Sequence, residues 1–158
     1  MEDLFAGVDV STQGQKIVII DLEKRSVIYS DSINYDVDLP KYNTLNGVIK
    51  DTETGVSESN PNMWIDSLHL LFERLKTSSD IIQSIKSISV AGQQHGLVAI
   101  AKDGNLAKST SKLWNDFSTA EECEILTKEI GGFEQMIHSV ANSQRTGYTA
   151  SKIFHMYR

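Results

Sequence analysis

The chain has 158 residues, of which 40% are hydrophobic and 23% charged, a composition that suits one water-soluble domain with a hydrophobic core. Its formal net charge of −6 argues against nucleic-acid binding through a basic surface, although backbone N–H groups can still hold a phosphate locally. No apolar run approaches the roughly 20 residues of a membrane helix, and the acidic start is unlike a signal peptide. The single cysteine, Cys123, excludes an internal disulfide, so we expect a cytoplasmic protein.

Three β-rich segments open the chain and predict an antiparallel meander, with turns near Gly14 and Glu23. The expected strands are Leu4–Val10, Lys16–Asp21 and Ser26–Tyr35. Residues 36–61 contain both prolines and many polar side chains, so we expect an extended loop that crosses over the sheet. A helix should then begin near Pro61 and place its apolar residues, spaced as in a helix over Met63–Lys76, on one face of the sheet.

The second half predicts one more strand and several helices. The strand covers Ile85–Ala91, and the chain continues extended over Leu97–Ala101 to a turn at Asp103-Gly104. Ser118 followed by Glu121 resembles a capping box, which predicts a helix to about Ile130 that ends at Gly131-Gly132. A further helix is expected over Phe133–Val140.

The last segment, Ser151–Arg158, has the pattern of the middle of a helix and no closing signal. This favours the front part of a longer chain over a natural C-terminal helix that frays into solvent. Strands followed by helix, strand and helices indicate an α/β layered domain.

The segment Gly7–Lys16 is the first candidate site. Asp9 ends a strand, where its carboxylate can hold Mg²⁺ directly or through water. The hydroxyls of Ser11 and Thr12 and the loop N–H groups can grip phosphate oxygens, while Gln13 and Lys16 can add donors. The alternative is a surface hairpin whose polar residues only satisfy a turn. The chain has neither the P-loop pattern nor a Gly-x-Gly-x-x-Gly, which disfavours a P-loop kinase and a dinucleotide fold.

The hexapeptide Ala91–Gly96 is the second candidate site. It follows a strand and places Gln94 and His95 where small polar ligands bind in α/β proteins. Trp114 and Asn115 are a third candidate, because an apolar wall beside hydrogen-bonding groups suits a sugar. Each has a structural alternative, namely a packing histidine near a strand end and a core tryptophan before a helix cap.

Four segments in register resemble the FGGY family of carbohydrate kinases, and within it the xylulokinases, over nearly the whole chain. They are Gly7–Gln13, Ala91–Gly96, Leu113–Asp116 and Gly147–Ile153. The resemblance implies an α/β, actin-like (ribonuclease H-like) ATPase domain, with a mixed sheet, an antiparallel β-meander and covering helices. It also implies that residues 1–158 are a truncated N-terminal kinase domain, with the remainder of this domain and a second, nucleotide-binding domain beyond residue 158.

The resemblance further implies ATP-dependent phosphorylation of D-xylulose to D-xylulose 5-phosphate, with ATP and Mg²⁺ as cofactors. Asp9 matches the catalytic acidic residue that works with the metal and the transferred phosphate. Ser11, Thr12 and Gln13 match the loop near the phosphates. The aspartate expected as general base lies beyond residue 158, so the isolated chain is expected to be inactive.

On the sugar side, Gln94 and His95 match the pair that lines the sugar site, and Trp114 and Asn115 match a segment that shapes it. We expect Asp9, Gln94 and His95 to open onto one cleft at the same end of a sheet. Alternatives are another polyol or ketose kinase of this family, for ribulose or glycerol, and a non-catalytic actin-like binding module. The expected partner is a small sugar, with no nucleic acid and no membrane. The apolar surface that a truncated domain exposes favours self-association into a homo-oligomer.

Overall fold

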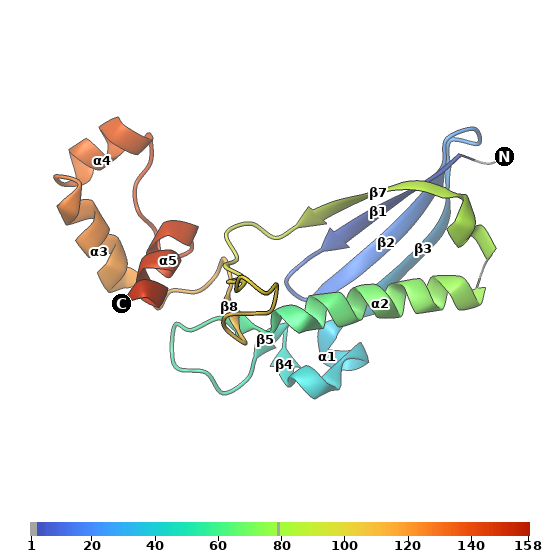
Figure 1. The fold of residues 1–158 in the computed structure, drawn as a ribbon, viewed down its shortest axis with the longest axis horizontal. Coiled ribbons are helices and arrows are strands. Elements are labelled where there is room, and N and C mark those ends of the chain that lie inside the picture. The colour runs from blue at the N-terminus through green and yellow to red at the C-terminus, as the bar shows by residue number, and fades with distance from the viewer. Residues whose placement is uncertain (1–2, 79) are drawn as a thin grey trace. The chain divides into compact units, whose positions relative to one another are not determined.

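The computed structural model describes residues 3–78 and 80–158, which form two compact units (Figure 1). The first unit comprises the described residues of Met1–Lys50 and Asn60–Gln93. The second comprises Asp51–Ser59 and Gln94–Arg158. Among the helices in the described residues, none combines the length and the hydrophobicity needed to cross a bilayer.

A four-stranded mixed sheet forms the first unit. Its strands, in spatial order, are β3 (Ser26–Asn34), β2 (Gly14–Asp21), β1 (Leu4–Val10) and β7 (Ile85–Gly92). The first three are antiparallel neighbours, whereas β7 pairs parallel to β1. This arrangement confirms the predicted meander. Strand β2 begins two residues earlier than expected because Gly14 and Gln15 already pair with β3.

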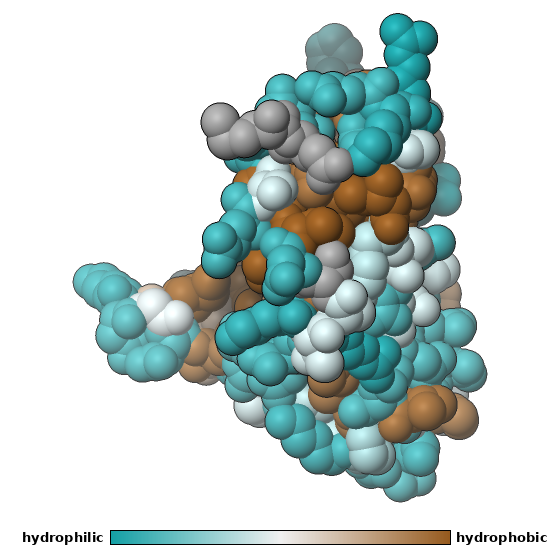
Figure 2. All heavy atoms as spheres, turned by 90° about the vertical axis from the view of Figure 1, so that its right-hand side faces the viewer, coloured by the Kyte–Doolittle hydropathy of each residue, from teal (hydrophilic) through white to brown (hydrophobic). Residues whose placement is uncertain are grey.

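Helix α2 (Pro61–Ser78) packs on one face of this sheet, as predicted (Figure 1). Strand residues of period two and helix residues four apart supply the buried side chains. The core includes Leu4, Ala6, Val8, Ile17, Ile19, Met63, Leu71 and Leu75. Each fully buried leucine or isoleucine contributes about 1.5–3 kcal/mol. In the face drawn in Figure 2, hydrophobic side chains form one larger patch and several smaller ones, and hydrophilic side chains cover most of the rest.

The prediction of an extended loop over residues 36–61 is wrong, because much of this segment forms short helices and strands. In the first unit it contains α1 (Tyr35–Asp38), the 3₁₀ turn η1 (Pro40–Tyr42) and the hairpin of β4 (Thr44–Leu45) and β5 (Val48–Ile49). The amide oxygen of Asn34 caps α1 by accepting from two backbone N–H groups. Asn46 and Gly47 both have positive φ, which is typical of a two-residue hairpin turn.

The second unit contains a short antiparallel pair and three helices. The pair is β6 (Glu58–Ser59) with β8 (Ser111–Lys112), and the helices are α3 (Ala120–Glu129), α4 (Phe133–Val140) and α5 (Thr149–Tyr157). The predicted bounds of α4 and the glycine end of α3 are confirmed. The expected extended run Leu97–Ala101 is not a strand, since only two isolated bridges form there, at Leu97 and Ile100. In the first unit, the 3₁₀ turn η2 (Asp80–Ser84) precedes β7.

The predicted capping box at Ser118 is wrong. Helix α3 has Thr119 as its N-cap residue, without a side-chain capping bond. The hydroxyl of Ser118 donates instead to Asp116 Oδ1 at 2.7 Å and accepts from Lys112 Nζ at 2.6 Å. The Ser118 hydroxyl, which the local sequence pattern assigned to the helix end, is therefore already hydrogen-bonded to a carboxylate and an ammonium group.

Candidate functional site

The turn after β1 brings a carboxylate and a hydroxyl together. Asp9 is the penultimate residue of β1 and is exposed. Ser11 Oγ donates to Asp9 Oδ2 at 2.6 Å, and the Ser11 backbone N–H donates to Gly14 O at 2.9 Å. The second bond closes a tight turn. The segment is therefore a hairpin turn, as both sequence interpretations required, with its polar groups gathered around Asp9.

Strand β7 brings the start of the glutamine–histidine segment to this turn. Ala91 pairs with Asp9 in parallel register, and the Gln93 N–H donates to Val10 O at 3.1 Å. Thr12 Oγ1 donates to Gln93 Oε1 at 3.3 Å, across 81 positions of the chain. Gln93 is therefore a site residue that the sequence interpretation quoted within its motif but did not select. Two adjacent glutamines gave no local signal for which of them contacts the turn.

Buried polar residues support the turn from below. The fully buried Tyr35 donates its hydroxyl to Ser11 O at 3.3 Å and its backbone N–H to Gln13 O at 3.1 Å. Burial raises the pKa of Tyr35 to about 12, so its hydroxyl remains a neutral donor. Beside it, Ser67 Oγ donates to Gln15 Oε1 within the core. These contacts fix the turn's backbone without using the side chains that reach solvent.

An open hollow of about 280 Å³ lies beside Asp9. It is lined by Gly7, Val8, Asp9, Lys16, Val18, Ser89 and Ala91. Lys16 is the antiparallel partner of Asp9, so an ammonium and a carboxylate line the same hollow. The volume lies just below the range of about 300–1,000 Å³ that is typical of small-molecule pockets.

In the second unit, His95 is exposed and held in an unusual backbone conformation. Its φ is +59°, in the left-handed region that non-glycine residues seldom occupy. The centroid of its ring lies 4.7 Å from that of Tyr148, with the planes tilted by 36°. Its carbonyl oxygen accepts a hydrogen bond of 2.7 Å from Lys152 Nζ. Gln94, its neighbour in the chain, is also exposed.

The Leu113–Asp116 segment contains residues that hold it in place and one that is accessible to solvent. Asp116 is fully buried and accepts from the Ser57 N–H at 2.8 Å. Asn115 Oδ1 accepts from Ser57 Oγ at 2.8 Å, so this amide holds the segment in place. The side chain of Trp114, in contrast, is 50% exposed. The alternative of a core tryptophan is therefore wrong, and Trp114 offers an accessible apolar surface.

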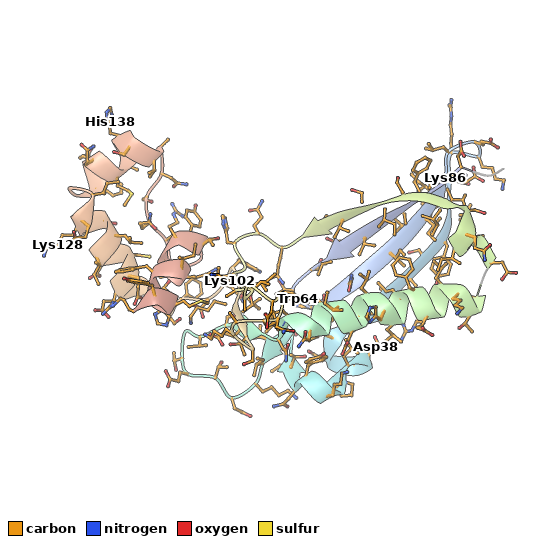
Figure 3. The ribbon with its side chains drawn as sticks, viewed as in Figure 1. Asp38, Trp64, Lys86, Lys102, Lys128 and His138 are labelled. Carbon is orange, nitrogen blue, oxygen red and sulfur yellow. The ribbon has the colours of Figure 1, made fainter. Side chains whose placement is uncertain are left out.

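The structure groups the phosphate-side candidates in the first unit and the sugar-side candidates in the second. The first group is Asp9, Ser11, Thr12, Gln13 and Lys16, and the second is Gln94, His95, Trp114 and Asn115. The expectation that both groups open onto one cleft stays a prediction. His138, labelled in Figure 3, is exposed on α4, and His155 contacts Glu122.

Across residues 3–78 and 80–158, no cluster of three or more histidine, cysteine or carboxylate side chains is arranged to hold a metal. Asp9 is therefore a single-carboxylate candidate. This fits Mg²⁺, which commonly uses one or two protein carboxylates and takes its other ligands from water and substrate phosphates. The hydrogen bond from Ser11 restricts the orientation of this carboxylate.

Known proteins with related sequences and folds resemble this chain. Among curated relatives, xylulose kinase of Schizosaccharomyces pombe is 36% identical over 169 residues, covering 95% of this chain and 30% of its own length. Xylulose kinase of Rattus norvegicus is 32% identical, covering 94% of this chain and 32% of its own length. The chain thus spans about a third of the length of these relatives.

Solved structures show the same fold. The crystal structure of xylulose kinase from Rhodospirillum rubrum matches 98% of this chain and 29% of its own with a TM-score of 0.80 at 19% identity. That of gluconate kinase from Lactobacillus acidophilus matches all of this chain and 29% of its own with a TM-score of 0.78 at 21% identity. These likenesses confirm the predicted actin-like α/β fold. The family model for the N-terminal domain of FGGY carbohydrate kinases matches residues 4–156, so the chain belongs to the FGGY family of carbohydrate kinases.

Proposed function

We propose that this chain is the N-terminal part of an ATP-dependent sugar kinase that phosphorylates D-xylulose to D-xylulose 5-phosphate. The observation that carries the proposal is the parallel pairing of Asp9 with Ala91 together with the Thr12–Gln93 hydrogen bond. It joins the phosphate-side turn to the start of the segment that bears Gln94 and His95. The curated relatives described above, which are xylulose kinases, favour xylulose among the sugars of this family.

On the phosphate side, the proposal assigns binding and charge stabilisation to the turn after β1. When it is bound together with ATP, Mg²⁺ would neutralise negative charge on the phosphates. Asp9 holds the metal, and the Ser11 hydroxyl keeps that carboxylate oriented. Thr12, Gln13 and the backbone N–H groups contact phosphate oxygens, and Lys16 adds a positive charge beside Asp9. Phosphoryl transfer depends mostly on such positioning and charge stabilisation.

On the sugar side, the proposal assigns recognition of hydroxyl groups to Gln94 and His95. An amide and an imidazole offer both donors and acceptors, which suits a polyhydroxylated substrate. Trp114 supplies an apolar wall, and Asn115 holds the segment through Ser57. The proposed location is the cytoplasm, in keeping with a sequence that has one cysteine.

NMR titration of the ¹⁵N-labelled 158-residue chain tests the sugar assignment. D-Xylulose should shift the signals of Gln94, His95 and the Trp114 indole with millimolar affinity, whereas glycerol should do so more weakly. His95→Ala should abolish the xylulose-dependent shifts, and His138→Ala, on α4, should preserve them. Equal responses to glycerol, D-ribulose and D-xylulose would favour another polyol kinase, and the absence of shifts at Gln94 and His95 would contradict the sugar assignment.

A second titration tests the phosphate assignment. Mg²⁺ with ADP should shift the amides of Ser11 to Gly14, and Asp9→Asn should weaken this response about tenfold, while Asp51→Asn in the other unit should not. Replacing Mg²⁺ by paramagnetic Mn²⁺ should broaden the His95 signals if the two groups serve one site. Broadening confined to the turn would contradict the common cleft and leave the phosphate assignment intact.

We expect no turnover by this chain alone, because the aspartate expected as general base is not among residues 1–158. A general base typically accelerates a reaction by about 10²–10⁴-fold. Incubation with ATP, Mg²⁺ and D-xylulose should yield no measurable D-xylulose 5-phosphate above the uncatalysed rate. Turnover comparable to that of an intact sugar kinase would contradict the assignment of residues 1–158 as a partial kinase domain. Binding of xylulose without any contribution from Asp9 would favour the non-catalytic module.

Self-association is part of the proposal because the edge strand β7 exposes apolar side chains. Ile88 is 50% exposed and Val90 64% exposed. Large exposed apolar residues on an edge strand favour pairing with another copy. Analytical ultracentrifugation should show dimers or larger species that Ile88→Lys converts to monomers, and a monomeric wild-type chain at high concentration would contradict this part.

A further inference from the structure

Lys152 on α5 is a lysine with no solvent exposure in the second unit. Its ammonium donates three hydrogen bonds, each 2.7 Å long, to the backbone carbonyl oxygens of His95, Leu113 and Gly147. An ammonium group has three N–H donors, so all of them are used. A buried charge is tolerated only when it is hydrogen-bonded, and each bond to a charged group is among the stronger kinds.

The three carbonyl groups lie directly next to three ring-bearing residues. The His95 carbonyl belongs to the histidine itself, while the Leu113 and Gly147 carbonyls belong to the peptide bonds that lead into Trp114 and Tyr148. A hydrogen bond that holds one peptide plane restricts the backbone on either side of it, since only φ and ψ remain free there. One ammonium thus bonds to three backbone segments of the second unit.

The geometry of these loops shows that they need to be held. His95 has a φ of +59°, a conformation that persists only when surrounding contacts stabilise it. A β-carbon on Gly147 would lie 2.5 Å from the carbonyl oxygen of Trp114, so these two backbones are in direct contact. The rings of His95 and Tyr148 lie 4.7 Å apart. These features cluster around the ammonium of Lys152.

We propose that Lys152 is a positioning residue for the sugar site, whose ammonium holds the loops of His95, Trp114 and Tyr148 in the arrangement that binds the sugar, with Tyr148 supporting the His95 ring. The inference rests on the proposed function for its sugar, but its structural part is measured without any sugar. Lys152 does not contact the substrate in this proposal. It acts through the three carbonyl groups.

The NMR signature of His95 tests this directly. In the wild-type chain, the ring protons of His95 should carry a ring-current shift from Tyr148. Lys152→Met should remove that shift and weaken D-xylulose binding at least about tenfold. The matched control is Lys112→Met, because Lys112 is a second buried lysine of the same unit, bonded to Ser118, and its loss should destabilise the unit while the His95 shift remains.

Chemical rescue distinguishes the ammonium from the volume of the side chain. In a Cys123→Ala background, Lys152→Cys alkylated with bromoethylamine regenerates a lysine-like ammonium, whereas alkylation with iodoacetamide leaves a neutral amide. The first product should regain the His95 shift and the second should not. Equal recovery by both, or an unchanged His95 shift in folded Lys152→Met, would overturn the proposal.

A measurement on the wild-type chain covers the case in which Lys152→Met fails to fold. The Lys152 ammonium should give a slowly exchanging ¹⁵N signal coupled to the carbonyl carbons of His95, Leu113 and Gly147. An ammonium that exchanges as fast as that of the exposed Lys128, labelled in Figure 3, would overturn the proposal. If the wild-type chain fails to bind D-xylulose, the proposed function is contradicted, while the His95 and ammonium signals still decide the role of Lys152.

Discussion

Gly47, at the turn of the β4–β5 hairpin, lies against the backbone carbonyl oxygen of Thr12. A β-carbon at position 47 would collide with this oxygen. The hairpin therefore presses on the outside of the turn that carries the phosphate-side candidates, while Tyr35 holds it from inside the core. Two layers of backbone contact thus restrict a turn in which the side chains of Ser11 and Gln13 are exposed.

Gly47→Ala should destabilise the first unit by about 2–5 kcal/mol. A left-handed residue with a β-carbon costs about 1–2 kcal/mol, and the collision with Thr12 adds about 1–3 kcal/mol. Gly104→Ala is the control, since Gly104 also has positive φ and no atom lies within 4 Å of the added carbon. Urea unfolding read by Trp64 for the first unit and by Trp114 for the second measures both, in single-tryptophan variants. Equal losses in the two variants would show that the contact with Thr12 is unimportant.

Asp36→Asn should release the same hairpin. The Asp36 carboxylate accepts from the Asn46 N–H at 2.6 Å, the Gly47 N–H at 3.1 Å and Thr44 Oγ1 at 2.7 Å. Loss of its charge should lower the unfolding free energy of the first unit at pH 7 by about 1.5–3 kcal/mol. Asp103→Asn, at a local turn in the second unit, should leave the Trp64 transition unchanged.

The pH dependence of this contribution has a definite sign. Partial burial acts to raise the pKa of Asp36, but the hydrogen bonds from Thr44, Gly47 and Asn46 outweigh it and the pKa is lowered. A lowered folded-state pKa means that the stabilisation is complete above the unfolded value of about 3.9 and is lost as the pH falls through the folded-state value. The difference in unfolding free energy between wild type and Asp36→Asn should therefore shrink as the pH falls from about 5 to about 2, the range in which a paired carboxylate becomes protonated. A difference that grows as the pH falls would contradict the assignment.

Tyr35→Phe should loosen the turn from below while the core stays filled. It removes the hydroxyl bonded to Ser11 O and little volume, so we expect a loss of about 0.5–1.5 kcal/mol. Hydrogen exchange of the Ser11 amide, which donates to Gly14 O, should accelerate. Tyr29→Phe, at a partly exposed position on β3, is the control and should leave that amide unchanged. Unaltered exchange in Tyr35→Phe would show that the turn does not depend on the buried hydroxyl.

The sequence predicted the elements whose burial has a simple period. Apolar and β-branched runs located β1 and β2, and apolar residues at helical spacing located α2. The hairpin over residues 44–49 was not predicted, although Asn46-Gly47 is a strong hairpin signal, because strands of two residues contain no period to detect. The capping box failed because Asp116 and Lys112 compete for the Ser118 hydroxyl, and that competition depends on tertiary contacts.

The candidate site was predictable in its residue types and less so in its partners. Asp9 was placed at a strand end from the sequence, and the structure adds that Ser11 bonds to it. The contact of Gln93 with Thr12 follows from the parallel register of β1 and β7. It joins two residues 81 positions apart, so no local sequence pattern predicts it. Lys152 lies within the Gly147–Ile153 segment, but its burial was not predicted, because a lysine within a helix is usually a solvated residue.

Glu122 on α3 bonds to His155 on α5 and to Arg158, which follows that helix. Its side chain is 6% exposed and lies 3.1 Å from both His155 Nδ1 and an Arg158 guanidinium nitrogen. Burial acts to raise the pKa of Glu122, but its hydrogen bonds and the charges of His155 and Arg158 outweigh it, so the pKa is lowered. Its stabilisation is therefore present above the unfolded-state value and lost as the pH falls through the folded-state value.

Glu122→Gln should lower the unfolding free energy of the second unit by about 1.5–3 kcal/mol at pH 7, because the hydrogen bonds of a buried carboxylate to two charged groups are weakened. Glu121→Gln is the matched control, since Glu121 also bonds to Arg158 but is 68% exposed, and such surface pairs contribute about 0–1 kcal/mol. The Trp114 transition in urea at pH 7 and near pH 3 measures both variants. If burial decides the strength of the pair, only Glu122→Gln loses stability at pH 7, and it converges with wild type in acid. Similar losses for the two variants would assign the contribution to Arg158 alone.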